Sequence, residues 1–376
     1  MAKLALFLPN LLGGGAERCF VNLARALSNR GHAVDLVVSN KSGPYVDEVP
    51  ASVRLVNLDV AVPLLSFGKL AGYLRRERPA ILYSALNQAN VAAIVASKLC
   101  SEHVPVAIGV HNSLSLEAKN AAGINLKMMP YFVKTFYPLA DSIVAVSDGV
   151  ADDLAAFTGI GRGRISVIYN PVVSDQLFEE ASEPINHPWF TSETTPVVLA
   201  VGRLNIQKDY ATLLKAFRLL RSRMPARLLI LGEGDERGSL ERTISELNLT
   251  DSVSMPGFVR NPFAYMGRSA VLAMSSIYEG LPTVLIEALA LGCPIVSTDC
   301  KSGPREILAD GKYGDLVAVG DAEALASALE RTINKPRQSK SHDSWAPYGL
   351  AASAQRYEAL IDKGASQTLA LDRTKG

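Results

Sequence analysis

The sequence is poor in features that mark particular classes of protein. Cysteine is scarce: Cys19, Cys100, Cys293 and Cys300 are the four in 376 residues, and no two of them form a CxxC pair. This spacing argues against a disulfide framework and against a zinc knuckle. It is typical of a protein that works in a reducing compartment.

Neither sign of charge dominates the chain. Lys and Arg together number 38, Asp and Glu 37, and the formal net charge is +1. Because general nucleic-acid binders carry a clear positive excess, this balance argues against a nucleic-acid partner. The apolar share of 48% also argues against a disordered chain.

Long apolar runs are missing as well. The first run, Leu4–Leu8, ends at Pro9 and Asn10, and later runs are interrupted by Gly, Pro or charged residues. Such runs are too short for the core of a signal peptide or for a membrane span. We therefore expect a cytoplasmic protein without a transmembrane helix.

The chain does contain two series in which short apolar runs alternate with helix-period segments. The first series begins at Lys3–Leu8 and the second at Val197–Gly202. This alternation predicts an α/β protein with mostly parallel sheets that carry helices on both faces. The acidic, proline-bearing stretch from Asp175 to Pro196 has no clear period and is the best linker candidate.

The length of the chain suits two domains. We expect residues 1–172 to form one Rossmann-like domain and residues 173–348 a second. Residues 349–376 should form a last helix, packed back on the first domain, and a tail. Since doubly wound sheets bind ligands at the carboxyl ends of their strands, two such crevices are expected to face each other across a cleft.

A glycine-rich loop follows the first predicted strand. Gly13, Gly14 and Gly15 would let a ligand approach the backbone, and the free N–H groups at the start of the next helix favour an anion. Arg18 stands where a dinucleotide fingerprint needs its third glycine, and no Walker Gly-Lys-Ser/Thr is present. The loop is therefore either a phosphate contact of another kind or a tight turn. Glu17 and Arg18 would then face an acceptor or form a solvated first turn.

Two cations follow the first strand of the second series. Arg203 ends this strand, and Lys208 lies five residues further on. Arginine as a planar fork and lysine as a point charge suit the neutralisation of a diphosphate. The alternative is a pair of surface cations.

A second anion site is predicted where a strand passes into a helix near Pro282. Proline suits the first helical turn and would leave the N–H groups of Thr283, Val284 and Leu285 available.

Glu279 and Glu287 flank this helix start. Eight residues at helical rise span about 12 Å, whereas the two carboxylates of a glycoside hydrolase lie roughly 5–9.5 Å apart. The pair therefore fits the two parts of one long polyhydroxylated ligand better than it fits hydrolysis. Two solvated helix-end glutamates are the alternative.

The spacing Glu279-x7-Glu287, with Gly280-Leu281-Pro282 inside it, resembles the E-x7-E signature of the retaining family 4-type glycosyltransferases of the GT-B fold. That fold has two Rossmann-like, doubly wound domains facing each other across a cleft. The resemblance extends over most of the chain, and it includes the Gly13–Gly15 loop, His111, Asn170-Pro171, Gly202-Arg203 with Lys208, Gly232-Glu233-Gly234 and Gly257-Phe258.

The resemblance implies roles for these residues. Glu279 would hold hydroxyls of the donor sugar, Glu287 would hold the ribose, and His111 would contact the donor hexose and the reacting centre. From the residue alone, a lone histidine is more often a structural one.

Arg203 and Lys208 would stabilise the departing nucleoside diphosphate, and Gly257, Phe258 and Val259 would line the base pocket. Since no Asp-x-Asp ends a strand, we expect no metal, and no cofactor beyond the nucleotide sugar, which is a substrate.

The implied reaction moves a hexose or N-acetylhexosamine from a nucleotide sugar to a hydroxyl with retention, by front-face displacement. The loop Gly14–Arg18 reads GGAER and is similar to that of bacterial enzymes that extend lipid-linked glycans. This likeness favours a UDP-linked donor and a glycan or lipid-linked acceptor in polysaccharide, lipopolysaccharide or glycan assembly.

Three other functions remain open from the sequence. A UDP-N-acetylglucosamine 2-epimerase also has two facing domains, although it needs further acid and base groups. A nucleotide-sugar-binding partner without catalysis would keep the fold. The sheets alone also fit a dehydrogenase, against which the missing third glycine argues.

Peripheral membrane contact is a further hypothesis. Met128 and Tyr131 are interleaved with Lys119, Lys127 and Lys134, a pattern that suits the inner face of an anionic membrane. A buried helix with solvated lysines is the alternative.

Overall fold

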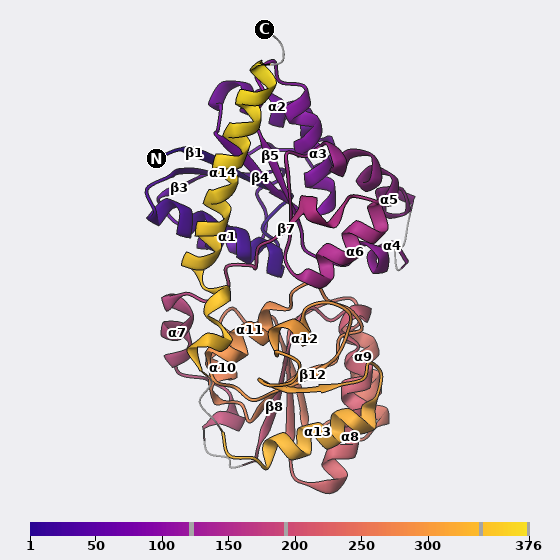
Figure 1. Ribbon diagram of the computed structural model, residues 1–376. Coiled ribbons are helices and arrows are strands. Elements are labelled where there is room, and N and C mark those ends of the chain that lie inside the picture. The colour runs from indigo at the N-terminus through magenta and orange to yellow at the C-terminus, as the bar shows by residue number, and fades with distance from the viewer. Residues whose placement is uncertain (120–123, 192–194, 338–340, 374–376) are drawn as a thin grey trace. The chain divides into compact units, whose positions relative to one another are not determined.

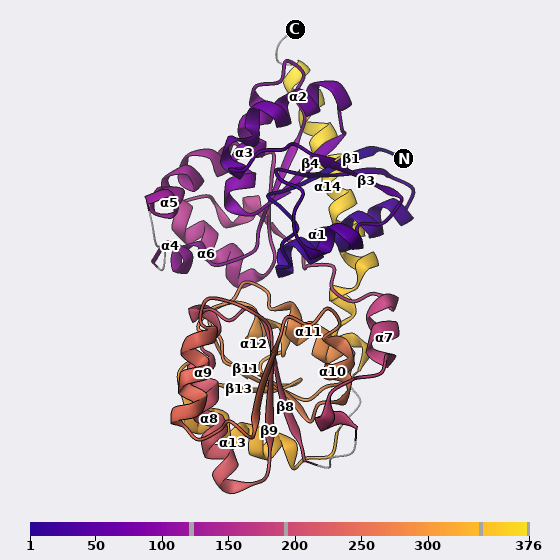
Figure 2. The same cartoon turned by 180° about the vertical axis from the view of Figure 1, so that it is seen from behind.

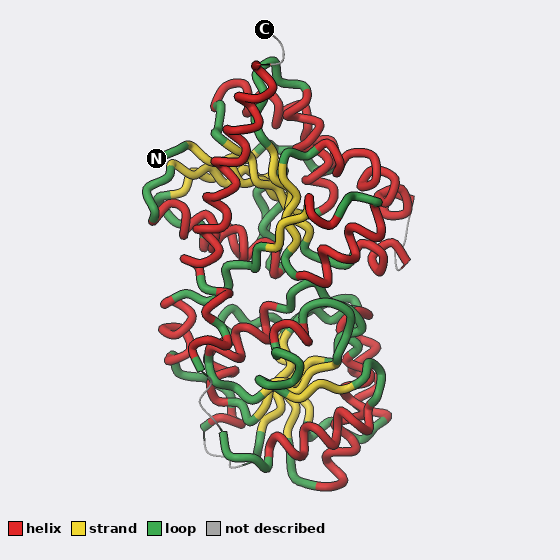
Figure 3. The backbone as a smooth tube through the Cα atoms, viewed as in Figure 1, coloured by secondary structure: helices red, strands yellow, loops and turns green. Residues whose placement is uncertain are grey.

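The computed structural model describes residues 1–119, 124–191, 195–337 and 341–373, with side chains described except at 124–127 and 362–373. The chain divides into two compact units. The first unit comprises Met1–Val172 together with Tyr348–Gly376, and the second comprises Val173–Pro347. Each unit is a sheet with helices on both faces, as Figure 3 shows in yellow and red.

In the described part of the first unit, seven parallel strands form one sheet in the order β3-β2-β1-β4-β5-β6-β7. The chain builds outward from β1 on one side and then returns to β4 on the other, so the order reverses between β1 and β4. Such a reversal separates the loops at the carboxyl ends of the two strands and opens a crevice there. The strands are β1 (Lys3–Leu8), β2 (Ala33–Val38), β3 (Val53–Asn57), β4 (Ile81–Ala85), β5 (Val106–Val110), β6 (Ser142–Ala145) and β7 (Ile165–Val167).

The last helix of the chain returns to the first unit and packs beside α1 over one face of the sheet (Figures 1 and 2). Arg30 at the end of α1 forms a two-pronged ion pair with Glu358 at 2.6 and 2.7 Å. Buried Tyr83 donates to the carbonyl of Tyr357 at 2.7 Å. The helices of this unit are α1 (Gly15–Asn29), α2 (Phe67–Glu77), α3 (Asn87–Lys98), α4 (Leu114–Lys119), α5 (Ile124–Phe136), α6 (Asp148–Thr158) and α14 (Leu350–Arg373).

The second unit repeats this plan. Its described residues form a six-stranded parallel sheet in the order β10-β9-β8-β11-β12-β13, which reverses between β8 and β11. The strands are β8 (Val197–Val201), β9 (Arg227–Leu231), β10 (Val253–Gly257), β11 (Val271–Met274), β12 (Ile295–Thr298) and β13 (Asp315–Val317).

Helices cover both faces of this second sheet, and α8 lies against α13 on one of them (Figure 2). The apolar side chains of both helices join the strands in one buried core. The helices are α7 (Asp175–Ser182), α8 (Tyr210–Arg223), α9 (Arg237–Glu246), α10 (Phe263–Arg268), α11 (Thr283–Ala290), α12 (Pro304–Ile307) and α13 (Ala322–Ile333).

The observed elements correct the sequence-based expectation at three points. The stretch expected to be an aperiodic linker contains α7, whose Leu177 is buried. The strand β3 was not predicted from the sequence; it lies at the sheet edge, includes Arg54 and is only partly buried. The last helix begins at Leu350, close to the expected start, and continues as far as Arg373.

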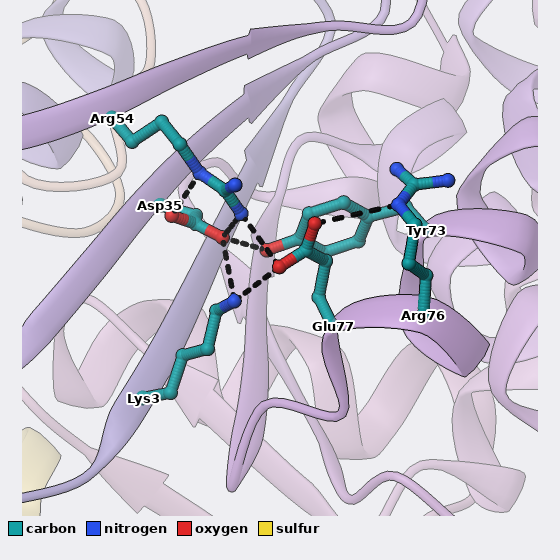
Figure 4. Close-up of polar contacts among 6 residues, drawn as sticks. All are labelled: Lys3, Asp35, Arg54, Tyr73, Arg76 and Glu77. Atoms are coloured by element: carbon teal, nitrogen blue, oxygen red, sulfur yellow. Dashed lines mark hydrogen bonds and ion pairs between the residues drawn. The ribbon is translucent and has the colours of Figure 1, made fainter.

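A cluster of charged side chains ties the first three strands to α2 (Figure 4). Asp35 is buried on β2 and accepts from Arg54 on β3 at 2.8 Å and from the hydroxyl of Tyr73 at 2.6 Å. Glu77 pairs with Arg54 at 2.9 Å and also with Lys3. These hydrogen bonds from Lys3 and Arg54 lower the pKa of Glu77 to about 2. Opposite charges therefore surround each carboxylate, and this arrangement holds α2 against the sheet.

Removal of Asp35 should destabilise the first unit. Asp35→Ala leaves the buried hydroxyl of Tyr73 without its acceptor and removes one of the two carboxylates that pair with Arg54, so we expect a loss of about 3 kcal/mol in the free energy of unfolding. Urea denaturation followed by circular dichroism measures this loss. Arg76→Ala is the matched control, because Arg76 is exposed and lies at the rim of the cluster (Figure 4). A loss no larger than that of the control, about 0.5 kcal/mol or less, would contradict the structural role of the cluster.

Candidate functional site

Two loops meet at the reversal of strand order in the second unit. One loop follows β8 and contains Gln207 and Lys208, and the other follows β11. The hydroxyl of Ser275 donates to the carbonyl of Lys208 at 2.7 Å, and the N–H of Ile277 donates to the carbonyl of Gln207 at 2.8 Å. These bonds fix the two loops to each other at the place where an open α/β sheet binds its ligand.

Glu279 lies in the second of these loops and is only 6% exposed. Its Oε1 accepts from the Nζ of Lys208 at 2.6 Å and from the hydroxyl of Ser276 at 2.7 Å. Among the described residues, its Oε2 has one long contact, 3.5 Å from the amide nitrogen of Gln207. The ion pair therefore engages one carboxylate oxygen, and the other can accept a hydrogen bond from a ligand hydroxyl.

Arg203 follows Gly202 at the end of β8, as the sequence predicts, and its side chain is exposed. In the described part of the chain it forms no ion pair or hydrogen bond through its guanidinium. The structure therefore brings Lys208 and Glu279 together, and Arg203 is an exposed cation five residues before Lys208 in the same loop.

The start of α11 differs from the expectation in one respect. Pro282 is the N-cap of this helix and not part of its first turn, and its carbonyl accepts the N–H of Leu285 at 3.1 Å. The N–H of Leu285 is thus already engaged, and the prediction that it is available to an anion is wrong. Among the described residues, the N–H groups of Thr283 and Val284 have no such acceptor.

Glu287 lies within α11, more than one helical turn after its start, and is only 7% exposed. The alternative of a solvated glutamate at the helix end is therefore wrong for Glu287. Phe258 follows β10 and exposes half of its surface, whereas Val259 is partly buried. The backbone beside them is shaped by Gly257, which lies against the carboxylate of Glu233. Their roles in holding a ribose and a base stay predictions.

The glycine loop of the first unit has an ordered internal structure. Gly14 is the N-cap of α1, Gly15 is the first residue of this helix, and the carboxylate of Glu17 folds back against Gly14. Arg18 packs over the ring of Tyr45 at 5.0 Å and donates to its hydroxyl at 3.2 Å. Glu17 and Arg18 are therefore no solvated first turn, and their expected place on the acceptor side stays a prediction.

His111 follows β5, as expected, and its ring lies near Phe20, with 6.0 Å between the ring centroids and with its Nε2 buried. Its Nε2 has no hydrogen-bond partner among the described residues. Burial lowers the pKa of His111 to about 4, so the imidazole is neutral near pH 7. A neutral ring can contact a sugar without adding charge to the site.

Two further residues of interest were not predicted from the sequence. They are Gln207, whose amide bridges the two loops of the second unit, and Glu117 in the first unit. Gln207 lies between the two expected cations, which was the available signal. Glu117 carries no local signal, because Asn87, one of the two side chains that hold it, lies thirty residues away in the sequence.

Comparison with known proteins identifies the family. The model of "Glycosyltransferase Family 4" matches residues 13–176, and that of "Glycosyl transferases group 1" matches residues 182–350. The lipopolysaccharide core biosynthesis glycosyltransferase LpsE of Rhizobium meliloti is 30% identical, over 85% of this chain and 86% of its own. The chain belongs to the glycosyltransferases.

A further relative of this glycosyltransferase is the N-acetylgalactosamine-N,N'-diacetylbacillosaminyl-diphospho-undecaprenol 4-alpha-N-acetylgalactosaminyltransferase of Campylobacter jejuni. It is 28% identical, over 91% of this chain and 93% of its own. Among solved structures, Anabaena Alr3699/HepE in complex with UDP and glucose superposes with a TM-score of 0.78 at 18% identity, covering 96% of this chain and 100% of its own. The apo form of the lipopolysaccharide outer core galactosyltransferase WaaB gives a TM-score of 0.66 at 22% identity, covering 98% and 99%. The predicted GT-B fold, with its two Rossmann-like sheets, is confirmed.

Of the helices described, none is both long and apolar enough to cross a bilayer.

The buried state of His111 predicts its titration. In NMR spectra of the full chain, the signal that His111→Gln removes should shift with an apparent pKa of about 4. Since the folded protein holds the ring neutral, His111 contributes stability above pH 6.5 that is lost as the pH falls toward 4. An apparent pKa between 6 and 7 would show that the ring is hydrated, contrary to the structure.

Proposed function

We propose that this glycosyltransferase transfers a hexose or N-acetylhexosamine from a UDP-linked sugar to a hydroxyl of a glycan or lipid-linked acceptor, with retention and without a metal ion. The pairing of Lys208 with buried Glu279 at the strand-order reversal of the second unit carries this proposal. The pair places a cation for a diphosphate beside a carboxylate for sugar hydroxyls.

The charges suit a nucleotide-sugar donor. In the free protein, Lys208 neutralises Glu279 and Arg203 remains exposed. A diphosphate would bring negative charge to these two cations and to the N–H groups at the start of α11, and the same groups would stabilise the charge that grows on the leaving diphosphate. These groups would carry out the electrostatic work for which other transferases use a divalent ion.

The remaining lone pairs of Glu279 would orient the sugar, and His111 would contact the donor hexose. In the proposed step, the acceptor oxygen forms a bond to the anomeric carbon on the face from which the diphosphate oxygen departs. The acceptor proton passes to an oxygen of the leaving phosphate. The step is balanced without an enzyme nucleophile and gives retention.

The relatives support the acceptor class. The Campylobacter jejuni relative is named for a diphospho-undecaprenol acceptor, and LpsE is named for lipopolysaccharide core biosynthesis. The Anabaena structure is named as a complex with UDP and glucose, which supports a UDP-linked donor. A place in polysaccharide, lipopolysaccharide or glycan assembly follows as part of the proposal.

A panel of UDP-, GDP- and ADP-linked hexoses and N-acetylhexosamines tests the reaction. We expect release of UDP, insensitive to EDTA, and a fall in kcat of about a hundredfold or more in Lys208→Ala and in Glu279→Gln, because each removes a group that meets developing charge or the sugar. Arg223→Ala, at the far end of α8, is the control and should keep full activity.

Two outcomes would overturn this proposal. No turnover with any donor would exclude transfer from these nucleotide sugars. Interconversion of the donor when no acceptor is present would indicate an epimerase.

We also propose that the protein is cytoplasmic and makes peripheral contact with the inner face of an anionic membrane. On α5, the side chains of Met128 and Tyr131 are 46% and 67% exposed, and Lys134 is exposed beside them. Lys119 is exposed at the end of α4, and the side chain of Lys127 lies outside the described residues. Exposed apolar groups next to lysines suit an anionic headgroup region.

Flotation with vesicles of phosphatidylglycerol and phosphatidylethanolamine measures this contact. The variant Met128→Ser with Tyr131→Ser should bind about tenfold more weakly, since it removes the apolar groups that would enter the headgroups. Leu99→Ser is the matched control. Leu99 is also an exposed apolar residue, 50% exposed, but it follows the C-terminal end of α3, away from the carboxyl edge of the sheet. Equal flotation of all three proteins, or none by the natural protein, would contradict membrane contact through α5.

A further inference from the structure

A second carboxylate, Glu117, lies at the carboxyl edge of the sheet in the first unit. It is carried by α4, which follows β5, and it is partly exposed. Asn87 opens α3 directly after the neighbouring strand β4, and Asn112 lies between β5 and α4. Three polar side chains from two adjacent strand ends are therefore gathered beside the strand-order reversal of this sheet.

Two amides hold the carboxylate of Glu117. The Nδ2 of Asn112 donates to Oε1 at 2.8 Å, and the Nδ2 of Asn87 donates to Oε2 at 3.0 Å. A carboxylate oxygen can accept two hydrogen bonds, so each oxygen keeps one acceptor position after these contacts. Asn87 and Asn112 are partly exposed like Glu117, so a ligand can reach the group.

A buried hydrogen bond fixes the orientation of the Asn87 amide. Its Oδ1 accepts from the hydroxyl of fully buried Tyr137 at 2.8 Å, which leaves its Nδ2 to face Glu117. Tyr137 in turn accepts from Asn90 at 3.1 Å, and Asn90 also donates to the carbonyl of Gly109 at 2.9 Å. This buried chain of hydrogen bonds reaches β5, so the carboxylate is held by the sheet itself.

Glu117 differs from Glu279 in the charge of its partners. Glu279 has Lys208 at 2.6 Å, whereas among the described residues no cation pairs with Glu117. Burial raises the pKa of Glu117, and the amides of Asn112 and Asn87 oppose that shift. A carboxylate without a cation repels a phosphate but accepts a hydrogen bond from a neutral hydroxyl.

We propose that Glu117, held between Asn87 and Asn112, binds a hydroxyl of the acceptor's sugar and so orients the acceptor for transfer. This inference rests on the proposed function and adds the residue that recognises the acceptor. The two asparagines hold the carboxylate in place, and the ligand is the sugar of the acceptor and not its diphosphate.

The test separates acceptor from donor binding. The acceptor probes are farnesyl diphosphate-linked glucose, N-acetylglucosamine and N-acetylgalactosamine, and the donor is the one that turns over in the panel. Glu117→Gln should raise KM for the acceptor probe roughly tenfold to a hundredfold, the range for a lost hydrogen bond to a charged group. Its KM for the donor, and its rate of donor hydrolysis by water, should stay within about twofold of the natural protein.

Asp141→Asn is the matched control. Asp141 is a partly buried carboxylate of the same unit that accepts from the backbone N–H of Val106 at 2.8 Å, at the opposite end of β5 from Asn112. It should lower the melting temperature without raising KM for the acceptor. If Glu117→Gln does not fold, Glu117→Asp keeps the charge and draws it back by one methylene, and KM for the acceptor should still rise.

The outcomes distinguish this inference from the proposed function. Failure of the natural protein to turn over any donor, or to glycosylate any probe, overturns the proposed function and the inference with it. Normal turnover by the natural protein with an unchanged acceptor KM in the Glu117 variants overturns the inference alone. An equal loss for transfer and for donor hydrolysis would show a structural role for Glu117 and would also overturn it.

Discussion

Parallel strands can be joined only by connections that cross back over the sheet, and this puts the carboxyl end of every strand on one edge. Both sheets of this protein are parallel throughout their described strands, so all of the loops at that edge are available to a ligand. The strand order reverses between β1 and β4 in the first unit and between β8 and β11 in the second. The glycine loop, His111, Lys208 and Glu279 all follow strands at or next to these reversals.

The two carboxylates at these edges have different surroundings, and the difference separates their proposed ligands. Glu279 is paired with Lys208, and the loop that contains Lys208 also carries exposed Arg203, so these surroundings suit a charged donor that also offers hydroxyls. Glu117 is held by two neutral amides, so its surroundings suit an uncharged hydroxyl. In this proposal, the second unit recognises the diphosphate of the donor, and the first unit recognises the sugar of the acceptor.

The fold could be predicted from the sequence because strands buried on both faces appear as short, continuous apolar runs. Ile81–Ala85 and Val197–Val201 are of this kind, and their alternation with helices indicated two parallel sheets. Val53–Asn57 was missed because it lies at the sheet edge and includes Arg54. The helix α7 was missed because its eight residues contain few apolar side chains from which a period could be read.

The sequence predicted those parts of the candidate site that residues close together in the chain form. It did not predict the parts that depend on contacts between distant residues. The loop after β8 and the E-x7-E spacing lie within short stretches, so Arg203, Lys208 and Glu279 could be named in advance. The engaged N–H of Leu285 depends on the backbone at Pro282. Glu117 depends on Asn87, thirty residues away, and no local pattern records that contact.

The central claim is that the loops after β8 and β11 of the second unit hold the nucleotide of the donor. Hydrogen–deuterium exchange of the full chain, read by mass spectrometry with and without UDP, tests this claim most directly. The account predicts slower exchange on UDP binding in residues 202–208 and 275–287. Slower exchange confined to the glycine loop at residues 13–18, or no change in the second unit at saturating UDP, would contradict it.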